Sequence, residues 1–213
     1  MRIRITFTKQ GALRYTGHLD LNTLLERAAR RANLPLAYSQ GFHPTPKIQI
    51  ASALPLGFSS RAEMMDIWLT TDCELSKLRH DLQDALPRDI QILDIEPVDE
   101  RAPALQTQVI AAEYEVTLSD DSASDLTPDL DAVLDAASLP RERRGKLYDL
   151  RPLIESLAIA PNPSPEDGRG EQRIFMRLTA REGATGRPEE VLDALGIPAE
   201  SVRVERTRLI FKG

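Results

Sequence analysis

Three arginines on one predicted helix have the type and spacing that suit phosphate binding. Arg27, Arg30 and Arg31 are related as i, i+3 and i+4, which brings their side chains to one helix face, opposite the apolar stripe. A guanidinium group can donate two parallel hydrogen bonds to a phosphate. The pattern therefore predicts a phosphate-binding face. The alternative is a solvated face on which Glu26 pairs with one of the arginines.

An aromatic segment follows this helix in the chain. Tyr38, Phe42 and His43 alternate with polar residues, and the segment ends at Lys47. Aromatic rings beside cations stack unpaired nucleotide bases. Two prolines within the segment restrict its backbone, which lowers the entropy lost on binding. We therefore predict a base-stacking loop. The alternative is a structural arm whose Phe42 fills the core.

The residues that precede the same helix form a third candidate site. His18 is predicted at the helix start, where free backbone N–H groups favour anions and the helix dipole favours the neutral imidazole. Gly17 would let a ligand approach the backbone, and Asp20 follows in the first turn. With Arg14 and Tyr15 nearby, His18 suits a general base. The alternative is that His18 and Asp20 only cap the helix.

A fourth candidate lies in the second half of the chain, where Arg151 stands in the sequence Y-D-L-R-P (148–152). A glycine-containing loop at 183–188 precedes another predicted helix and could accept an anion, with a plain turn as the alternative. No P-loop, G-x-S-x-G elbow or H-E-x-x-H pair is present. The histidines lack metal-ligand spacing, and the single cysteine, Cys73, excludes an internal disulfide and a Cys-rich metal site.

Charge is distributed unevenly along the 213 residues. Residues 1–71 hold nine Lys and Arg against four Asp and Glu, a balance of +5, while the whole chain carries −6. The remainder therefore carries −11. A basic first third on an acidic chain indicates a surface for an anionic partner, with ordinary solvated faces as the alternative.

Alternation and helical spacing predict the elements that position these residues. The first half is expected to contain strands at 2–8, 47–54, 64–70 and 90–97 and helices at 18–33 and 74–86. The second half, after a linker at 99–107, is expected to contain strands at 108–118, 153–160, 171–180 and 201–211, helices at 126–138 and 188–195, and a loop at 161–168. The order in each half is β-α-β-β-α-β. The sequence therefore predicts an α+β protein of two tandem ferredoxin-like repeats, 1–98 and 108–213, with mainly antiparallel sheets.

Several stretches also resemble a known family. The longest is H-L-D-L-N-T-L-L-E-R-A-A-R-R-A-N-L-P-L-A-Y-S-Q-G-F-H-P-T-P-K-I, residues 18–48, and shorter ones are A-L-P-L-G (53–57), E-M-M-D-I (63–67), Y-D-L-R-P (148–152) and G-R-P-E-E-V-L-D-A-L-G (186–196). Together they resemble the radical SAM-linked (radical SAM-associated) proteins, whose defining domain has no assigned function. The resemblance implies a separate cobalamin-binding radical SAM protein as partner. Some members lie near ribonuclease E/G-type genes, which implies RNA as a second partner.

We therefore expect a cytoplasmic accessory protein that binds RNA or another anionic substrate for a radical SAM enzyme, with no catalytic activity, cofactor or metal of its own. The start of the chain lacks the apolar core of a signal peptide, and no apolar run approaches membrane-spanning length. The alternative is a metal-independent RNA endonuclease with His18 as general base, because tandem ferredoxin-like repeats are similar to the CRISPR repeat-associated RNA endonucleases. A third hypothesis is a protein–protein scaffold that binds no nucleic acid.

Overall fold

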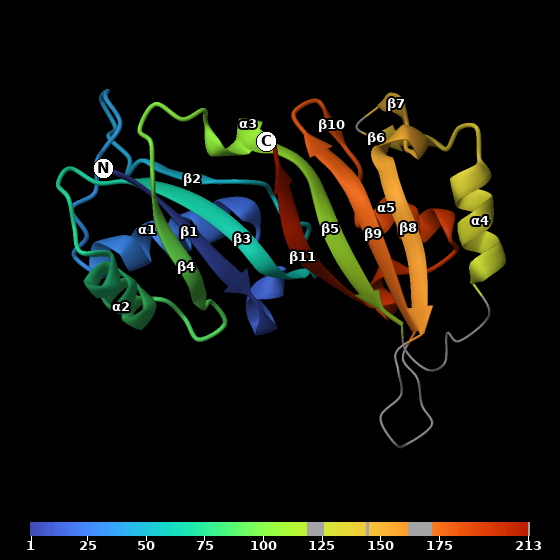
Figure 1. Ribbon diagram of the computed structural model, residues 1–213, viewed down its shortest axis with the longest axis horizontal. Coiled ribbons are helices and arrows are strands. Elements are labelled where there is room, and N and C mark those ends of the chain that lie inside the picture. Colours follow the sequence, from blue (N-terminus) through green and yellow to red (C-terminus); the bar gives the residue numbers. More distant parts are fainter. Residues whose placement is uncertain (119–125, 144, 162–171, 213) are drawn as a thin grey trace, which may run out of the picture. The chain divides into compact units, whose positions relative to one another are not determined.

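The computed structural model describes residues 1–118, 126–143, 145–161 and 172–212, and the chain divides into two compact units (Figure 1). The first unit is Met1–Val109 and the second is Ile110–Gly213. The expected ranges of the two repeats, 1–98 and 108–213, stay a prediction. Each unit combines an antiparallel sheet with helices, which confirms the expected α+β class.

The first unit has a sheet in which β1 lies between β3 and β4, and β2 pairs with the other edge of β3; all these pairs are antiparallel. The order across the sheet is β4-β1-β3-β2. The elements, in chain order, are β1 (Arg2–Lys9), η1 (Gly11–Tyr15), α1 (His18–Arg31), β2 (Ile48–Ile50), β3 (Ser59–Trp68), α2 (Leu75–Ala85), β4 (Ile92–Val98) and α3 (Leu105–Gln108).

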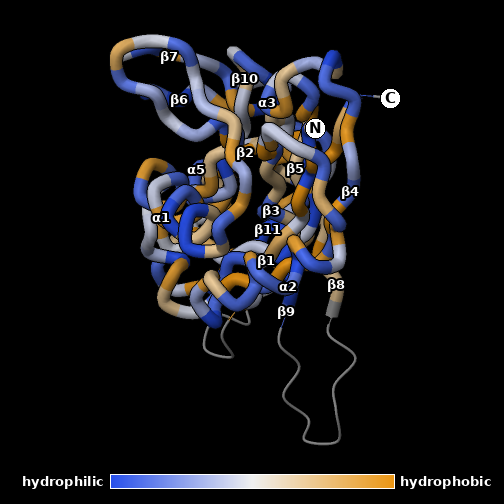
Figure 2. The backbone as a smooth tube through the Cα atoms, turned by 90° about the vertical axis from the view of Figure 1, so that its left-hand side faces the viewer, coloured by the Kyte–Doolittle hydropathy of each residue, from blue (hydrophilic) through white to orange (hydrophobic). Residues whose placement is uncertain are grey.

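The core of the first unit lies between this sheet and its two long helices. Ile3, Ile5 and Phe7 alternate along β1 and are fully buried. Leu25 of α1 and Leu82 of α2 belong to the same apolar cluster. Figure 2 shows orange apolar residues alternating with blue polar ones along the chain. The alternation predicted for residues 2–8 is therefore the reason why one face of this sheet carries the helices.

A left-handed residue ends α1 and sets the direction of the segment that follows. Asn33 has φ 53°, a conformation that Asn tolerates better than most residues. The N–H of Leu34 donates to the carbonyl oxygen of Ala29 at 3.1 Å, and the N–H of Asn33 donates to that of Arg30 at 3.0 Å. This Schellman pattern closes the helix just before Pro35.

The other face of the first sheet holds a buried ionic cluster. The carboxylate of Asp66 on β3 is fully buried and accepts from Arg2 Nε and Nη2 at 2.9 and 2.6 Å and from Arg4 Nε at 2.9 Å. Arg2 also donates to the carbonyl oxygens of Ala102 and Pro103 at 2.6 and 2.9 Å, which anchors the chain after β4. Its guanidinium carbon lies 4.7 Å from the centroid of the Trp68 ring.

The second unit is built around β9, which pairs antiparallel with β5 on one side and with β8 and β10 on the other; β11 lies beside β5. A separate hairpin, β6–β7, stands outside this sheet. The elements are β5 (Val109–Thr117), α4 (Thr127–Asp135), β6 (Pro140–Arg143), β7 (Lys146–Asp149), η3 (Arg151–Leu153), β8 (Ile154–Pro161), β9 (Gln172–Arg181), β10 (Ala184–Thr185), α5 (Pro188–Ala194), η4 (Ala199–Ser201) and β11 (Arg203–Phe211).

Several element boundaries differ from the prediction. Strand β2 covers only 48–50 of the predicted 47–54, and β3 begins at residue 59 instead of 64. The hairpin β6–β7 was not predicted, because residues 140–149 are mostly charged and lack an apolar period. Of the loop predicted at 161–168, residues 162–168 lie outside the described part of the chain. Within the described ranges, no helix combines the length and apolar character needed to span a membrane.

The Asp66→Asn variant should lower the free energy of unfolding by about 3–5 kcal/mol, because it removes the shared countercharge of two arginines in a buried cluster. Urea unfolding followed by circular dichroism measures the loss. Asp81→Asn is the matched control: Asp81 accepts from Lys77 at 2.6 Å on the exposed surface of α2, and its loss should not change stability measurably. Equal effects of the two substitutions would contradict the role given to Asp66.

Candidate functional site

The three arginines of α1 separate into two groups. Arg30 lies 3.6 Å from Glu26, whose carboxylate also accepts from Asn22 at 2.8 Å. Arg27 and Arg31 instead line a hollow of about 360 Å³ on the surface of the first unit. The alternative in which Glu26 pairs with one arginine holds for Arg30. The phosphate-binding role of the face that carries all three arginines stays a prediction.

The hollow that Arg27 and Arg31 line also contains an acid. Its other described lining residues are Asp20, Thr23 and Leu24, all from α1. Arg31 Nη1 donates to the carbonyl oxygen of Ala85 at the end of α2, at 3.2 Å. This bond holds the Arg31 side chain against the end of α2. A guanidinium group can bind a phosphate in a bidentate manner, and this role of Arg27 and Arg31 stays a prediction.

His18 is the first residue of α1, and its side chain is exposed. Gly17 is the N-cap, and no described side chain forms a capping hydrogen bond there, so the alternative that His18 and Asp20 cap the helix by such a bond is wrong. Asp20 still lies in the first turn, where a negative charge interacts favourably with the helix dipole. His18 and Asn22 line a second hollow, of about 410 Å³, against residues 48–53 and Gln106.

Arg14 and Tyr15 form a pair of their own within η1. Arg14 Nη2 donates to the Tyr15 hydroxyl at 2.8 Å, and its guanidinium carbon lies 4.7 Å from the centroid of the Tyr15 ring. The Tyr15 side chain is 64% exposed. Neither residue is among the described residues that line the hollow beside His18. The hollow thus presents His18 without the neighbours expected to assist it.

Residues 37–47, here called the arm, form an ordered hairpin-like segment that projects from the first unit (Figure 1). Within the arm, the N–H of Ser39 donates to the carbonyl oxygen of Thr45, and that of Lys47 donates to Ala37, both at 2.8 Å. At its base, the N–H of Ala37 donates to the carbonyl oxygen of Trp68 at 2.8 Å, and the N–H of Trp68 donates to that of Lys47 at 3.1 Å. The backbone of the arm is therefore fixed to the sheet.

The aromatic side chains of the arm face solvent. Phe42 is fully exposed at 101%, and Tyr38 is 43% exposed. His43 and Lys47 are exposed as well. The alternative in which Phe42 fills the core is therefore wrong. Phe42 and Tyr38 are therefore accessible to a ligand.

Arg151 belongs to the second unit, where it contacts backbone. Its Nε donates to the carbonyl oxygen of Leu134 at 2.9 Å, and its Nη1 donates to that of Ile154 at 3.2 Å. Asp149 Oδ1 accepts from the N–H groups of Leu139 and Arg151 at 2.7 and 2.9 Å. These two donors hold the pKa of the Asp149 carboxyl below its usual value of 3.8. Both side chains thus hold together the turns around β6–β7.

Sequence reasoning missed two basic residues, Arg143 and Lys146. They line a cavity in the second unit together with parts of the two segments singled out separately above, 148–152 and 183–188. The signal was present: residues 141–146 read R-E-R-R-G-K, a basic run in an otherwise acidic half of the chain.

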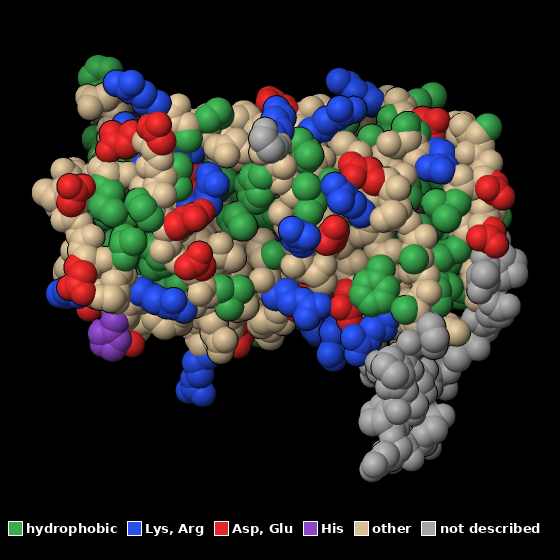
Figure 3. All heavy atoms as spheres, in the orientation of Figure 1, with side chains coloured by type: hydrophobic (Ala, Val, Ile, Leu, Met, Phe, Trp, Pro, Cys, Tyr) green, Lys and Arg blue, Asp and Glu red, His purple; other side chains and the backbone are tan. Residues whose placement is uncertain are grey.

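Elsewhere, charges of opposite sign lie close together. On the face drawn in Figure 3, Lys and Arg side chains are interspersed with Asp and Glu. In the second unit Arg177 pairs with Glu155 at 2.8 Å, and Arg173 pairs with Glu115 at 2.7 Å. No group of His, Cys, Asp and Glu among the described residues is arranged to hold a metal ion.

Fold and site together define a mixed α+β protein with an exposed aromatic arm and arginine-lined surface. The chain belongs to a family of uncharacterized proteins conserved in bacteria (DUF2344), whose model matches residues 2–188. No curated protein matches the chain.

Two solved structures match over nearly the whole of this chain. A chain in the crystal structure of a Cbf5-Nop10-Gar1 complex has 9% identity and a TM-score of 0.50; the match covers 97% of this chain and 48% of that one. The present chain thus spans about half the length of that neighbour, and the likeness shows the fold alone. The crystal structure of an unknown protein from Galdieria sulphuraria has 16% identity, with 98% of each chain covered. Its TM-score of 0.27 is too low to indicate a shared fold.

The lowered pKa of Asp149 predicts how the stability of the second unit depends on pH. The carboxylate contributes stability above its unfolded pKa of 3.8, and this contribution is lost as the pH falls through the lower folded value. The wild type should therefore exceed Asp149→Asn in melting temperature at pH 7, and the difference should shrink as the pH falls below 3.8. Scanning calorimetry from pH 7 to pH 2.5 measures it; a difference that stays constant contradicts the assignment.

Proposed function

We propose that this chain is an accessory binding module that recognises single-stranded RNA and works with a separate cobalamin-binding radical SAM protein. The observation that carries the RNA part is the arm: its backbone is hydrogen-bonded to the sheet, while Phe42 at 101% exposure and Tyr38 at 43% remain open. Single-stranded RNA offers bases that can stack on such rings and phosphates for the cations beside them.

The physical argument rests on preorganisation. Stacking on a flexible loop would lose affinity to the ordering of that loop, whereas the arm already has its backbone fixed at Ser39–Thr45 and at Trp68. Exposed Lys47 and His43 lie in the same segment. Arg27 and Arg31 lie in the helix that leads to the arm, and they would supply a second contact for phosphate in their hollow.

The radical SAM part of the proposal rests on the sequence resemblance and on cysteine chemistry. Radical SAM clusters need three cysteine ligands, and this chain has only Cys73, so the radical chemistry would reside in another polypeptide. A cytoplasmic location is part of the same proposal.

Crosslinking in living cells, followed by identification of the bound RNA and proteins, tests the radical SAM partnership. Recovery of RNA without a radical SAM protein would rule out this partner.

We also propose that both units are ferredoxin-like repeats. The first unit has the chain order β1-α1-β2-β3-α2-β4 and the sheet order β4-β1-β3-β2. The second has the order β5-α4-β8-β9-α5-β11 once the hairpin β6–β7 and the short β10 are set aside. Chain order and antiparallel pairing in both units support this assignment.

The endonuclease alternative keeps one favourable observation, which is that the exposed imidazole of His18 lines a hollow of about 410 Å³ with the side chain of Asn22. A general base needs to be within reach of the hydroxyl that it deprotonates, and a hollow of this size admits part of a nucleotide. Shortening of RNA by the wild type, absent in His18→Ala, would favour this alternative over simple binding.

Phe42→Ala should weaken binding of a fluorescein-labelled single-stranded RNA of mixed sequence by about 5- to 150-fold, because one stacked base contributes about 1–3 kcal/mol. Fluorescence anisotropy at fixed salt measures this. Phe42→Trp keeps a flat ring and should retain binding. Leu93→Ala, which removes another exposed apolar side chain of the first unit, is the matched control and should have no effect. Equal affinity of wild type and Phe42→Ala would refute stacking by the arm.

The double variant Arg27→Gln/Arg31→Gln should reduce the salt dependence of the same RNA binding. Each phosphate contact that is lost lowers the slope of log K against log salt by about 0.7 for a single strand, so the pair should lower it by about 1.4. Arg30→Gln is the control, because Arg30 already pairs with Glu26. If Arg30→Gln changes the slope as much as the double variant does, the hollow is not the phosphate site.

A further inference from the structure

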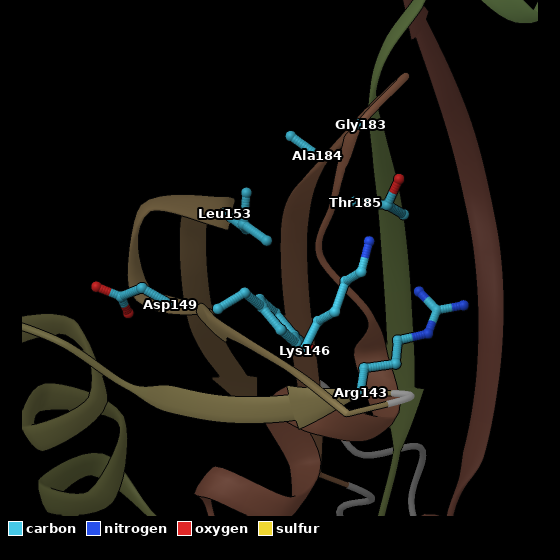
Figure 4. A pocket seen from close by; sticks show the side chains of 8 residues that line it. Arg143, Lys146, Asp149, Leu153, Gly183, Ala184 and Thr185 are labelled. Carbon is cyan, nitrogen blue, oxygen red and sulfur yellow. The ribbon is translucent and has the colours of Figure 1, made fainter.

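The second unit contains a cavity of about 530 Å³ between the hairpin β6–β7 and the turn that joins β9 to β10 (Figure 4). This volume lies within the range of small-molecule sites in proteins. The described residues that line it are Arg143, Lys146, Tyr148, Asp149, Leu153 and 183–185. The cavity thus joins two segments that are some thirty residues apart in the chain.

The register of the hairpin places two cations on the cavity side. Arg143 pairs directly with Lys146, and Arg141 pairs with Tyr148. Residues directly opposite in an antiparallel pair share a face, so Arg143, Lys146 and Tyr148 point to the same side. Leu147 belongs to the other face and is 81% exposed.

Within the described part of the chain, these two cations have no ion-pair partner. Like charges directly opposite on paired strands destabilise the pairing. Neither Arg143 nor Lys146 forms an ion pair or a side-chain hydrogen bond with any described residue. Asp149, the acid among the lining residues, already accepts two backbone N–H groups, and Figure 4 shows its carboxylate directed away from Lys146. An anion between the two cations would relieve their repulsion.

Tyr148 supplies an aromatic ring to the same cavity. Its hydroxyl is buried beside the carboxylate of Glu190, which accepts a hydrogen bond from it. Burial raises the pKa of Tyr148 to about 12, and the neighbouring Glu190 carboxylate adds to this effect, so the phenol stays protonated at neutral pH.

The opposite wall is small and partly apolar. Gly183 has φ +78°, which lets the chain reverse tightly between β9 and β10. Ala184 and Thr185 follow, and Leu153 lies on the remaining side. In Figure 4 the Lys146 side chain extends from the hairpin toward Thr185, so its ammonium group points to the opposite wall. The cavity therefore has two cationic side chains, Arg143 and Lys146, and an apolar wall that includes Leu153 and Ala184.

We propose that this cavity binds a small molecule that carries a phosphate group next to a planar ring, the chemistry of a nucleoside monophosphate. Arg143 and Lys146 hold the phosphate, and the ring lies against Tyr148 and Leu153. This site is separate from the arm and from the hollows of the first unit. The same chemistry is offered by a free mononucleotide and by the 5′-phosphorylated end of an RNA chain.

Isothermal titration of the full chain with AMP, GMP, CMP and UMP tests the proposal. At least one should bind, inorganic phosphate should bind more weakly, and adenosine should not bind. Arg143→Gln and Lys146→Gln should each weaken binding by about ten- to a hundredfold, because each removes a charge-assisted hydrogen bond. Arg203→Gln, an exposed arginine on β11, is the matched control and should change nothing.

Two further measurements separate binding from structure. Because the variants remove a like-charge repulsion, their melting temperatures without ligand should equal or exceed that of the wild type; a clear decrease would mean that the cations are structural and would overturn the proposal. Absence of binding by all four nucleotides overturns it as well. A 5′-phosphorylated dinucleotide that binds as well as the mononucleotide identifies a chain end as the ligand, and one that does not bind identifies the free nucleotide. Since Phe42 takes no part here, RNA binding by the arm can fail or succeed independently.

Discussion

The buried carboxylate of Asp66, shared by Arg2 and Arg4, is the interaction on which the first unit depends. Taking these charges out of water costs several kcal/mol for each ion, and only close hydrogen-bonded contacts offset that cost. Arg4 lies directly opposite Asp66 in the pairing of β1 with β3. A slip of one residue would separate the charges and turn Ile3, Ile5 and Phe7 toward the wrong face. The cluster therefore penalises every register except the observed one.

The position of the candidate RNA-binding arm follows from that register. The carbonyl and N–H of Trp68, at the end of β3, bond to Ala37 and Lys47 at the two ends of the arm. Trp68 itself pairs with Arg2 across β1 and β3, and its ring lies beside the Arg2 guanidinium. A rigid sheet thus carries the arm by its backbone and leaves the Phe42 side chain free, which separates the residues that set geometry from those available to a ligand.

The sequence alone predicted what depends on local periodicity. Alternation predicts that Ile3, Ile5 and Phe7 are buried, and helical spacing predicts which face of α1 is buried. The structure shows both faces in the core. The separation of Arg30 from Arg27 and Arg31 could not be read in this way, because residues at i, i+3 and i+4 span about 100° of helix surface. Tertiary packing decides that Arg30 lies beside Glu26 and that Arg31 contacts the end of α2. The cavity beside β6–β7 was missed for a similar reason, since its walls come from segments that only the fold brings together.

The net charge of −6 constrains how such a protein can bind an anion at all. The acidic excess lies in residues 72–213, and at physiological ionic strength the Debye length is about 8 Å, so acids farther away than this exert little repulsion. In the proposed functions, recognition then depends on local groups: the arm with its rings, the pair Arg27 and Arg31, and the pair Arg143 and Lys146. Each of these brings positive charge or aromatic surface together in one segment, hollow or cavity. A uniformly basic surface is therefore unnecessary for binding RNA or nucleotides, and discrimination against other polyanions would come from the rings rather than from charge.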